Sequence, residues 1–272
     1  MSSSVQAADD LIDRLLHARV FDLSQTVHAD MPQLPGLPRL SLSLLRRHGD
    51  ARRDAGYSSA QDLLVTISHA GTHIDAIGHV SVEGRLHGDR PAQETQTGVR
   101  GLRALGIEEV GPIVRRGVLL DIAGMLGVSL LDPAFRVTGA LLDRCLRSTG
   151  QELRPGDVVL VRTGWGSLWD DPERYVSREA GLPGVDADGA EWLAQRRPFA
   201  TGADCLMYER FHPSENGLPV HSRLIQGAGI HLIENMNLEP LADGGPAAFG
   251  FIALPLRLLG ATGSQIRPIA LA

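Results

Sequence analysis

The chain has 272 residues, of which 43% are hydrophobic and 21% are charged, and its formal net charge is −6. This composition is typical of a globular protein, and the acidic balance argues against a nucleic-acid-binding surface, which needs clustered basic side chains. All 26 basic residues are arginine, which excludes a lysine Schiff base and the lysine of a phosphate-binding P-loop.

No run of about 18 apolar residues occurs, and the N-terminus lacks the basic and apolar regions of a secretory signal. We therefore expect a cytoplasmic protein with no membrane partner. Cys145 and Cys205 are far apart in the sequence and match no metal-binding spacing. We expect two buried thiols rather than a disulfide.

The first part of the chain combines one helix with short strands. Leucine spacing predicts a helix over residues 9–19, and prolines forbid regular helix over residues 31–38. The other segments expected here are a strand over 19–24, a strand over 40–44, a polar surface loop over 46–59 and a β-rich segment over 63–68. In the segment 40–44 the leucines alternate, so we expect them to share one face.

The rest of the chain is mixed in the same way. After a polar, irregular stretch over 81–98, the expected strands are 115–122, 158–162, 229–233, 249–255 and 266–271, and the expected helices are 138–148 and 184–195. Thr138 is a suitable N-cap for the first of these helices. Because the elements show neither a regular βαβ rhythm nor a repeat, we predict one α/β domain over residues 1–272, with a mixed sheet and flanking helices.

One short segment concentrates chemistry-bearing side chains. Residues 69–79 read His-Ala-Gly-Thr-His-Ile-Asp-Ala-Ile-Gly-His and hold three of the ten histidines. In an extended conformation His69, His73 and Asp75 point to the same side. Imidazole nitrogen and carboxylate oxygen suit zinc, or manganese where carboxylate and water dominate. A single histidine is more simply a surface or core residue, but burying so many polar groups together is costly without a purpose, so we predict metal binding.

A metal ion held by this segment alone would lack ligands, so further ones are expected downstream. Candidates lie in the segments 218–225 and 229–236, which contain His221, His231 and Glu234. His231 is three residues before Glu234 and would face the opposite side of a strand, so we expect a core or surface role for it. The G-x-S-x-G pattern of a serine hydrolase is absent.

Residues 69–79 resemble the HxGTHxDxPxH signature of the cyclase family, which includes bacterial kynurenine formamidase and isatin hydrolase. The resemblance runs nearly end to end, and the further matching stretches are Asp22–Ser24, Met31–Pro32, Pro35–Gly36, Gly156–Trp165, Val220–His221 and Ile233–Asn235. It implies the swivelling β/β/α-like fold of that family. It also implies a homo-oligomer, in particular a dimer, whose neighbouring chain completes the pocket.

The resemblance further implies two divalent ions per chain, Zn²⁺ or Mn²⁺. His69 and His73 would hold the first ion and His221 the second. Asp75 and Glu234 would bridge or share the two ions, whose mutual repulsion bridging carboxylates offset.

The remaining histidine of the motif, His79, would be the general acid and base rather than a permanent ligand. A hydroxide shared between two ions is a nucleophile near neutral pH, and an imidazole titrates in the same range. His79 could therefore carry a proton to the leaving amine.

Two positions depart from the family pattern. Ile77 replaces the proline of the signature, and Gln33 and Leu34 occupy a turn in which the formamidases tend to have an aromatic residue. An aryl substrate would lack a stacking partner there, which favours a cyclic amide over an aryl formamide. The candidate substrate-binding residues are Leu34, Ile77, Trp165 and His212.

The predicted function is a metal-dependent hydrolase that uses a metal-activated hydroxide to cleave the C–N bond of a small-molecule amide. We favour a cyclic amide such as a lactam or an isatin-like ring. The alternatives are an aryl formamidase acting on kynurenine formamide and a lactone hydrolase. From another class come a non-hydrolytic, metal-dependent cyclase or dehydratase and a metal-binding protein without catalysis.

Overall fold

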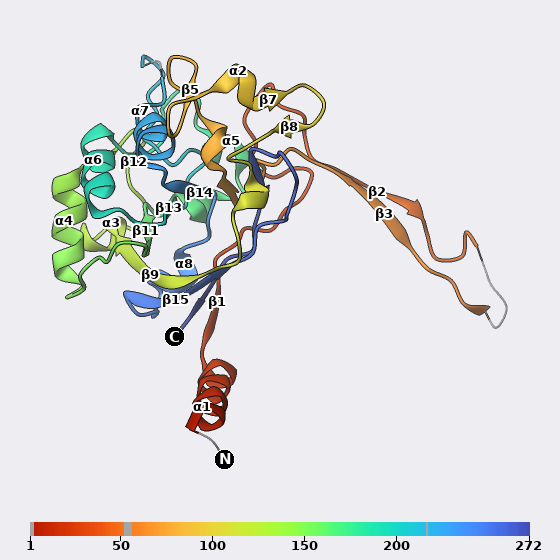
Figure 1. Cartoon of the computed structure of the whole chain (residues 1–272), viewed down its shortest axis with the longest axis horizontal. Helices are drawn as coiled ribbons and strands as arrows, with labels where there is room; N and C mark the ends of the chain where they lie inside the picture. Colours follow the sequence, from red (N-terminus) through yellow and green to blue (C-terminus); the bar gives the residue numbers. More distant parts are fainter. Residues whose placement is uncertain (1–2, 52–55, 216) are drawn as a thin grey trace.

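The computed structural model describes residues 3–51, 56–215 and 217–272, and within them a nine-stranded mixed sheet forms the centre of the molecule (Figure 1). In spatial order its strands are β1 (Val20–Asp22), β17 (Ile269–Leu271), β15 (Ala248–Ala253), β9 (Ile113–Asp121), β11 (Val158–Arg162), β13 (Ala200–Ala203), β14 (His231–Glu234), β4 (His73–Asp75) and β16 (Gly263–Gln265). The four neighbours from β9 to β14 are parallel, whereas the strands outside them are antiparallel to their neighbours.

Helices and short strand pairs surround this sheet. The helices are α1 (Ser3–His17), α2 (Ala92–Thr95), α3 (Ile122–Met125), α4 (Gly139–Ser148), α5 (Pro172–Val176), α6 (Ala187–Arg196), α7 (Pro219–His221) and α8 (Glu239–Ala242), with 3-10 turns η2 (Ile77–His79), η3 (Ile107–Glu109) and η4 (Trp165–Leu168) and the π-helical turn η5 (Ser222–Gly227). The strand pairs are β2 (Ser41–Arg46) with β3 (Gln61–Val65), β5 (Arg85–Leu86) with β6 (Arg90–Pro91), β7 (Gln96–Thr97) with β8 (Gly101–Leu102), and β10 (Arg136–Val137) with β12 (Gly184–Val185).

Both faces of the sheet are buried, which explains the uninterrupted apolar sequence of β11. Val159 and Val161 point into one core cluster, which also contains residues of α4 and α6. Val158 and Leu160 point into a second cluster on the other face. A strand that is covered on both sides carries apolar residues at every position rather than at alternate ones. Figure 1 shows α4 and α6 side by side, where they cover the first face.

The predicted fold class is confirmed: the domain is mixed α/β, with helices flanking a mixed sheet. β11 has the predicted bounds, and α4 begins after Thr138, whose Oγ1 accepts a hydrogen bond from Leu141 N at 3.3 Å. The strands predicted at 19–24, 115–122, 229–233, 249–255 and 266–271 and the helix predicted at 184–195 are present with shifted ends. The first helix begins at Ser3 rather than at residue 9.

One region extends away from the sheet. β2 and β3 pair as a hairpin that projects from the body of the molecule (Figure 1). Every residue of both strands is exposed, including Leu42, Leu44 and Leu64. The alternating leucines therefore form a strand as predicted, but the described part of the chain covers neither of its faces. Residues 52–55 of the loop predicted at 46–59 lie outside the described residues.

Two composition-based expectations can be compared with the structure. Cys145 and Cys205 are buried free thiols, as predicted, and burial raises the pKa of each. Of the helices in residues 3–51, 56–215 and 217–272, none is long and apolar enough to cross a membrane.

Candidate metal centre

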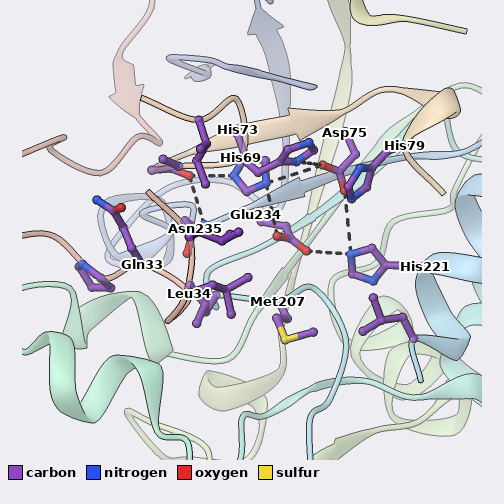
Figure 2. Close-up of a pocket in the computed structure, with 17 residues that line it drawn as sticks. Gln33, Leu34, His69, His73, Asp75, His79, Met207, His221, Glu234 and Asn235 are labelled. Atoms are coloured by element: carbon purple, nitrogen blue, oxygen red, sulfur yellow. Dashed lines mark hydrogen bonds and ion pairs between the residues drawn. The ribbon is translucent and has the colours of Figure 1, made fainter. Parts of the chain in front are cut away.

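The histidine-rich segment enters the main sheet as β4, and this brings distant residues together. β4 pairs with β14 in antiparallel register, with His73 opposite Glu234. His221 is the last residue of α7, directly before η5. As a result all five predicted ligands line one cavity, which Figure 2 shows together with His79.

A tight turn before β4 orients the His73 imidazole. Gly71 has a φ of +66°, and a Cβ at this position would lie 2.9 Å from Val27 Cγ2, so glycine is favoured. The Gly71 carbonyl accepts hydrogen bonds from His73 Nδ1 at 2.9 Å and from Asn235 Nδ2 at 3.1 Å. Because a carbonyl only accepts, Nδ1 carries the proton, and Nε2 is the free nitrogen that faces the carboxylates.

His69 is oriented by a loop from the other end of the chain. Its Nε2 lies 2.9 Å from Thr262 Oγ1, and its Nδ1 lies 2.8 Å from Asp75 Oδ1. The ring also packs at a tilt against His79, with the ring centroids 4.2 Å apart. His69 therefore presents Nδ1 to the centre, whereas His73 presents Nε2.

A buried carboxylate holds His221. Glu209 is 2% exposed and accepts hydrogen bonds from the backbone N–H groups of Val220 and His221, at 3.2 and 3.0 Å. It also accepts from His221 Nδ1, which turns Nε2 toward Glu234 Oε1 at 3.1 Å. A carboxylate that fixes the ring orientation and tautomer of a histidine ligand is a common feature of metal sites.

Asp75 is a buried carboxylate whose bonding is incomplete. It is 1% exposed, and within the described ranges neither of its oxygens takes part in a hydrogen bond of acceptable geometry. Imidazole nitrogens approach both oxygens. His69 Nδ1 lies 2.8 Å and His73 Nε2 3.7 Å from Oδ1, and His221 Nε2 lies 3.9 Å from Oδ2. An unsatisfied buried carboxylate among nitrogen donors is the arrangement expected around a divalent cation. The residues present therefore fit a metal centre.

Burial disfavours the charged forms of His221, His73 and Glu234, but attraction between their opposite charges outweighs burial. Burial alone would lower the pKa of His221, yet Glu209 and Glu234 raise it to about 10. For His73, burial is likewise outweighed by Glu234 and Asp75, and its pKa is raised. Burial favours a raised Glu234 pKa, but His221 and His73 hold it well below its usual range. These carboxylates and imidazoles together therefore attract positive charge.

His79 is the exception among these histidines. Burial lowers its pKa, and the attraction of Asp75 does not compensate for this. The neutral form of this imidazole is therefore favoured near neutral pH, and a neutral imidazole can accept a proton.

The ligand atoms form two groups that share Asp75. In one group, atoms of His69, Asp75 and His79 all lie within 4.8 Å of one another; in the other, atoms of Asp75, His221 and Glu234 do so. Asp75 belongs to both groups, an arrangement compatible with the sharing that the family resemblance implies. His79 stands beside His69 in the first group, whereas His73 Nε2 lies 3.4 Å from Glu234 Oε2. The assignment of His73 as a ligand and of His79 as the acid and base stays a prediction.

The four predicted substrate-binding residues are dispersed. Leu34 lines the cavity of about 370 Å³ that contains the cluster. Ile77 lies in a separate hollow with His231, and His212 lies in another hollow, which Glu209 also lines. Trp165 is buried, and its Nε1 donates to the Tyr175 carbonyl at 2.9 Å. The structure therefore brings only Leu34 of the four to the cavity.

Residues outside the motif complete the supporting structure. His231 Nδ1 donates to the Asp75 carbonyl at 2.8 Å, which is the core role expected for His231. Glu209 and Thr262 were missed, because neither stands in a spacing that indicates a ligand. A signal for Glu209 is its position beside aromatic residues in the segment Tyr208–Phe211, where an acid needs a partner if it is buried.

The chain is similar in sequence to proteins of a known family. The sequence model of a family described as a putative cyclase matches residues 21–210. The chain is 26% identical over 217 residues to an isatin hydrolase of Roseibium aggregatum, a match that covers 78% of this chain and 74% of that protein. It is 25% identical over 260 residues to a kynurenine formamidase of Sphingopyxis alaskensis, covering 93% and 97%.

The fold has a counterpart among solved structures. The crystal structure of a protein described as a novel cyclase superposes with a TM-score of 0.86 at 25% identity, covering 100% of this chain and 92% of that one. The sheet and its flanking helices therefore follow an established architecture.

Proposed function

The chain belongs to the cyclase family, and we propose that it is a metal-dependent hydrolase that cleaves the C–N bond of an amide, in particular of a cyclic amide. The observation that carries this proposal is Asp75, a fully buried carboxylate at a cavity of ligand size. Its oxygens face the imidazole nitrogens of His69, His73 and His221, and in the described chain they take part in no hydrogen bond of acceptable geometry. The relatives named isatin hydrolase and kynurenine formamidase support the same class of reaction.

The proposed ligands are His69, His73, Asp75, His221 and Glu234. Divalent cations bound there would polarise the substrate carbonyl and lower the pKa of water. Nitrogen and oxygen donors together suit Zn²⁺ or Mn²⁺. The hydrogen bonds from His73 to Gly71 and from His221 to Glu209 hold the ligand nitrogens in position before a cation arrives.

His79 is the proposed proton carrier. In hydrolysis the C–N bond breaks, a C–O bond forms from water, and one proton must move to the departing nitrogen. His79 lines the cavity, and its lowered pKa favours a form that can take a proton from water and pass it to nitrogen. In a cyclic amide the amine and the carboxylate formed remain in one product molecule.

The cavity itself supports a compact, largely apolar substrate. Its lining includes Leu34, Leu37, Ile67 and Met207, and the described lining residues include no phenylalanine, tyrosine or tryptophan. An aryl formamide would lack an aromatic stacking partner here. The same holds for the fused benzene ring of isatin, so we place non-aromatic lactams ahead of aryl formamides.

A hydrolysis screen tests the proposal. Lactams, isatin, lactones and aryl formamides are incubated with metal-free protein and with protein loaded with Zn²⁺ or Mn²⁺, in water enriched in ¹⁸O. We expect metal-dependent release of a carboxylic acid that carries one ¹⁸O atom. Metal-dependent turnover without incorporation of ¹⁸O would instead identify a cyclase or dehydratase.

The variant His79→Ala distinguishes two roles of His79, a general acid and base or a metal ligand. His79→Ala should retain the metal content of the wild type, measured by plasma mass spectrometry, but lose at least about 100-fold in kcat, the usual contribution of a general acid or base. Loss of one ion per chain together with activity would show that His79 is a ligand, as its place beside His69 and Asp75 allows.

We also propose that the chain forms a homodimer. The apolar side chains of the β2–β3 hairpin and of α1 are exposed in the single chain, among them Leu44, Leu64 and Leu16. Exposed apolar surface of this kind marks association sites. Leu34 and Leu218, at the cavity, are exposed as well, so a second copy could complete the pocket.

Analytical ultracentrifugation tests the dimer. We expect a dimer for the wild type and a monomer for Leu44→Asp with Leu64→Asp, because charges on both strands of the hairpin oppose burial. Val99→Asp, at a fully exposed apolar residue outside the hairpin, is the matched control and should stay dimeric. A monomeric wild type would contradict the proposal.

A further inference from the structure

The cavity beside the metal centre is poor in polar groups. Beyond the proposed ligands and His79, the polar side chains among its described lining residues are Gln33 and Asn235. The remaining lining residues are Pro32, Leu34, Leu37, Ile67, Ala70, Gly71, Leu206, Met207 and Leu218. Apart from the proposed ligands and His79, these two amides are the lining side chains that can recognise a polar substrate group.

Asn235 already has a hydrogen-bond partner at both polar atoms of its side chain. Its Nδ2 donates to the Gly71 carbonyl at 3.1 Å, and its Oδ1 accepts from the Tyr175 hydroxyl at 2.9 Å. These bonds support the turn that orients His73, so the Asn235 side chain has a structural role.

Gln33 is in the opposite situation. Its Oε1 and Nε2 are both buried, and neither has a hydrogen-bond partner within residues 3–51, 56–215 and 217–272. Leaving a buried amide unpaired is unfavourable for each of its two polar atoms. Pro32 and Pro35 flank the residue and restrict the backbone that presents it. Figure 2 shows Gln33 on one side of the cluster and His221 on the other.

We propose that the Gln33 carboxamide recognises a second amide group of the substrate, one that is not cleaved. Nε2 donates to the carbonyl oxygen of that group and Oε1 accepts from its N–H. A ring amide presents both atoms on one edge, because its amide bond is held in the cis form. The substrate class is then a cyclic amide that carries a second amide in or on its ring.

A cyclic amide with a second amide is favoured because it pairs with both Nε2 and Oε1 of Gln33. A carboxylate on the substrate would satisfy Nε2 only and would place its second oxygen against Oε1. An ester or ketone would likewise leave Oε1 unpaired, and a hydrocarbon ring would leave both atoms unpaired. A site built to bond a polar group rejects analogues that lack it, because its own buried groups then stay unsatisfied. This inference rests on the proposed hydrolase function and refines its substrate class.

The test uses two six-membered rings of the same size. Piperazine-2,5-dione has two ring amides, and piperidin-2-one has one. Dissociation constants for both are measured by ligand-observed NMR with zinc-loaded protein, and hydrolysis is followed separately. The variants are Gln33→Leu, which removes both polar atoms, and Gln33→Glu, which keeps the shape but replaces the donor. Gln195→Leu, at an exposed glutamine of α6, is the matched control.

We expect the wild type and Gln195→Leu to bind the dione at least about 10-fold more tightly than the lactam. Both Gln33 variants should reduce this ratio toward one. Gln33→Leu should also unfold at the same or a higher temperature than the wild type, because the amide that it removes has no partner in the described chain. A purely structural role of Gln33 would instead lower the unfolding temperature.

The outcomes separate this inference from the proposed function. Equal binding of the two rings, no measurable binding of the dione, or a preference that survives in Gln33→Leu would overturn the role of Gln33, even if lactams are hydrolysed. A preference that depends on Gln33, with no hydrolysis of any amide in the screen, would support the recognition role and contradict the hydrolase.

Discussion

Asp75 and Asp204 are both completely buried, with exposed fractions of 1% and 0%, but their surroundings differ. Asp204 accepts hydrogen bonds from Thr163 N at 2.9 Å, from Thr163 Oγ1 at 2.7 Å and from Gly164 N at 2.8 Å. Asp75 accepts none of acceptable geometry within the described ranges and faces imidazole nitrogens instead. Burial alone therefore does not identify a site, whereas burial without hydrogen bonds does.

Asp204 and Asp75 also differ in the part of the structure to which each contributes. Asp204 stabilises the turn at Thr163–Gly164, and its backbone carbonyl accepts from the Tyr175 hydroxyl at 3.2 Å. The same hydroxyl donates to Asn235, which supports the turn before His73. Asp204 thus acts as part of the scaffold beneath the centre, while Asp75 lies in the centre itself.

The largest expected effect is that of Asp75→Asn. Removing a shared ligand should lower kcat/KM at least about 1,000-fold and reduce the metal content, because a metal site contributes several kcal/mol to the transition state. Plasma mass spectrometry and initial-rate assays measure both. Asp132→Asn, at an exposed aspartate, is the control. Wild-type metal content in Asp75→Asn would contradict the distinction between the two aspartates.

Asp204→Asn should show the opposite pattern. Its amide would turn an N–H toward the Gly164 N–H, so the free energy of unfolding should fall by about 2–3 kcal/mol. Chemical denaturation measures this loss. The folded fraction should still contain metal at the wild-type stoichiometry. A variant of unchanged stability that has lost its metal would show that Asp204 belongs to the centre.

The pH dependence of stability tests the buried state of Asp204. Burial raises the pKa of Asp204 from 3.8 to about 6. A carboxyl group whose pKa is raised by folding stabilises the fold at pH values below its pKa in the unfolded chain. This contribution is lost as the pH rises through its pKa in the folded protein. The free energy of unfolding of the wild type, relative to Asp204→Asn, should therefore decrease by about 2 kcal/mol between pH 4 and pH 6.5. A constant difference across that range would contradict the raised pKa.

Glu209→Gln should have the smallest effect, because Glu209 is hydrogen-bonded like Asp204 but acts on a ligand. The glutamine oxygen can still accept the two bonds from His221, but the amide N–H replaces the oxygen that accepts from Val220 N. A neutral amide orients His221 less well than a carboxylate does, so the affinity for one ion should fall about 10-fold, or about 1.4 kcal/mol. Titration with a competing chelator measures the affinity. Activity at saturating metal should change less than the affinity does. An unchanged affinity would show that Glu209 only stabilises the chain around α7.

Several parts of the fold could be predicted because their signals are local. The apolar run of β11, the Thr138 cap of α4 and the spacing of residues 69–79 all express short-range requirements of backbone and ligand geometry. β13 was missed, because Ala200–Ala203 consists of small residues with weak strand preference. It is a central strand only because β11 and β14 pair with both of its edges.

Some features of the candidate site could likewise be predicted from the sequence, and others could not. The types of ligand could be predicted, since three histidines and an aspartate fall within eleven residues of one short segment. The sharing of Asp75 between two ions is what the resemblance to the cyclase family implies, and it stays a prediction. The roles of Glu209 and Thr262 could not be predicted, because each acts on a histidine that is distant in the sequence. Similarly, neither Trp165 nor His212 reaches the cavity, although their residue types suit a pocket.

The family, the α/β class and the concentration of candidate ligands in residues 69–79 follow from the sequence, because these features depend on residue types at short spacing. Only the tertiary structure decided which of these groups meet and which remain unsatisfied. The antiparallel pairing of β4 with β14 places Glu234 opposite His73, and the packing leaves Asp75 and Gln33 without hydrogen bonds in the described chain. Burial and hydrogen-bond satisfaction depend on contacts between distant segments, which local sequence does not specify.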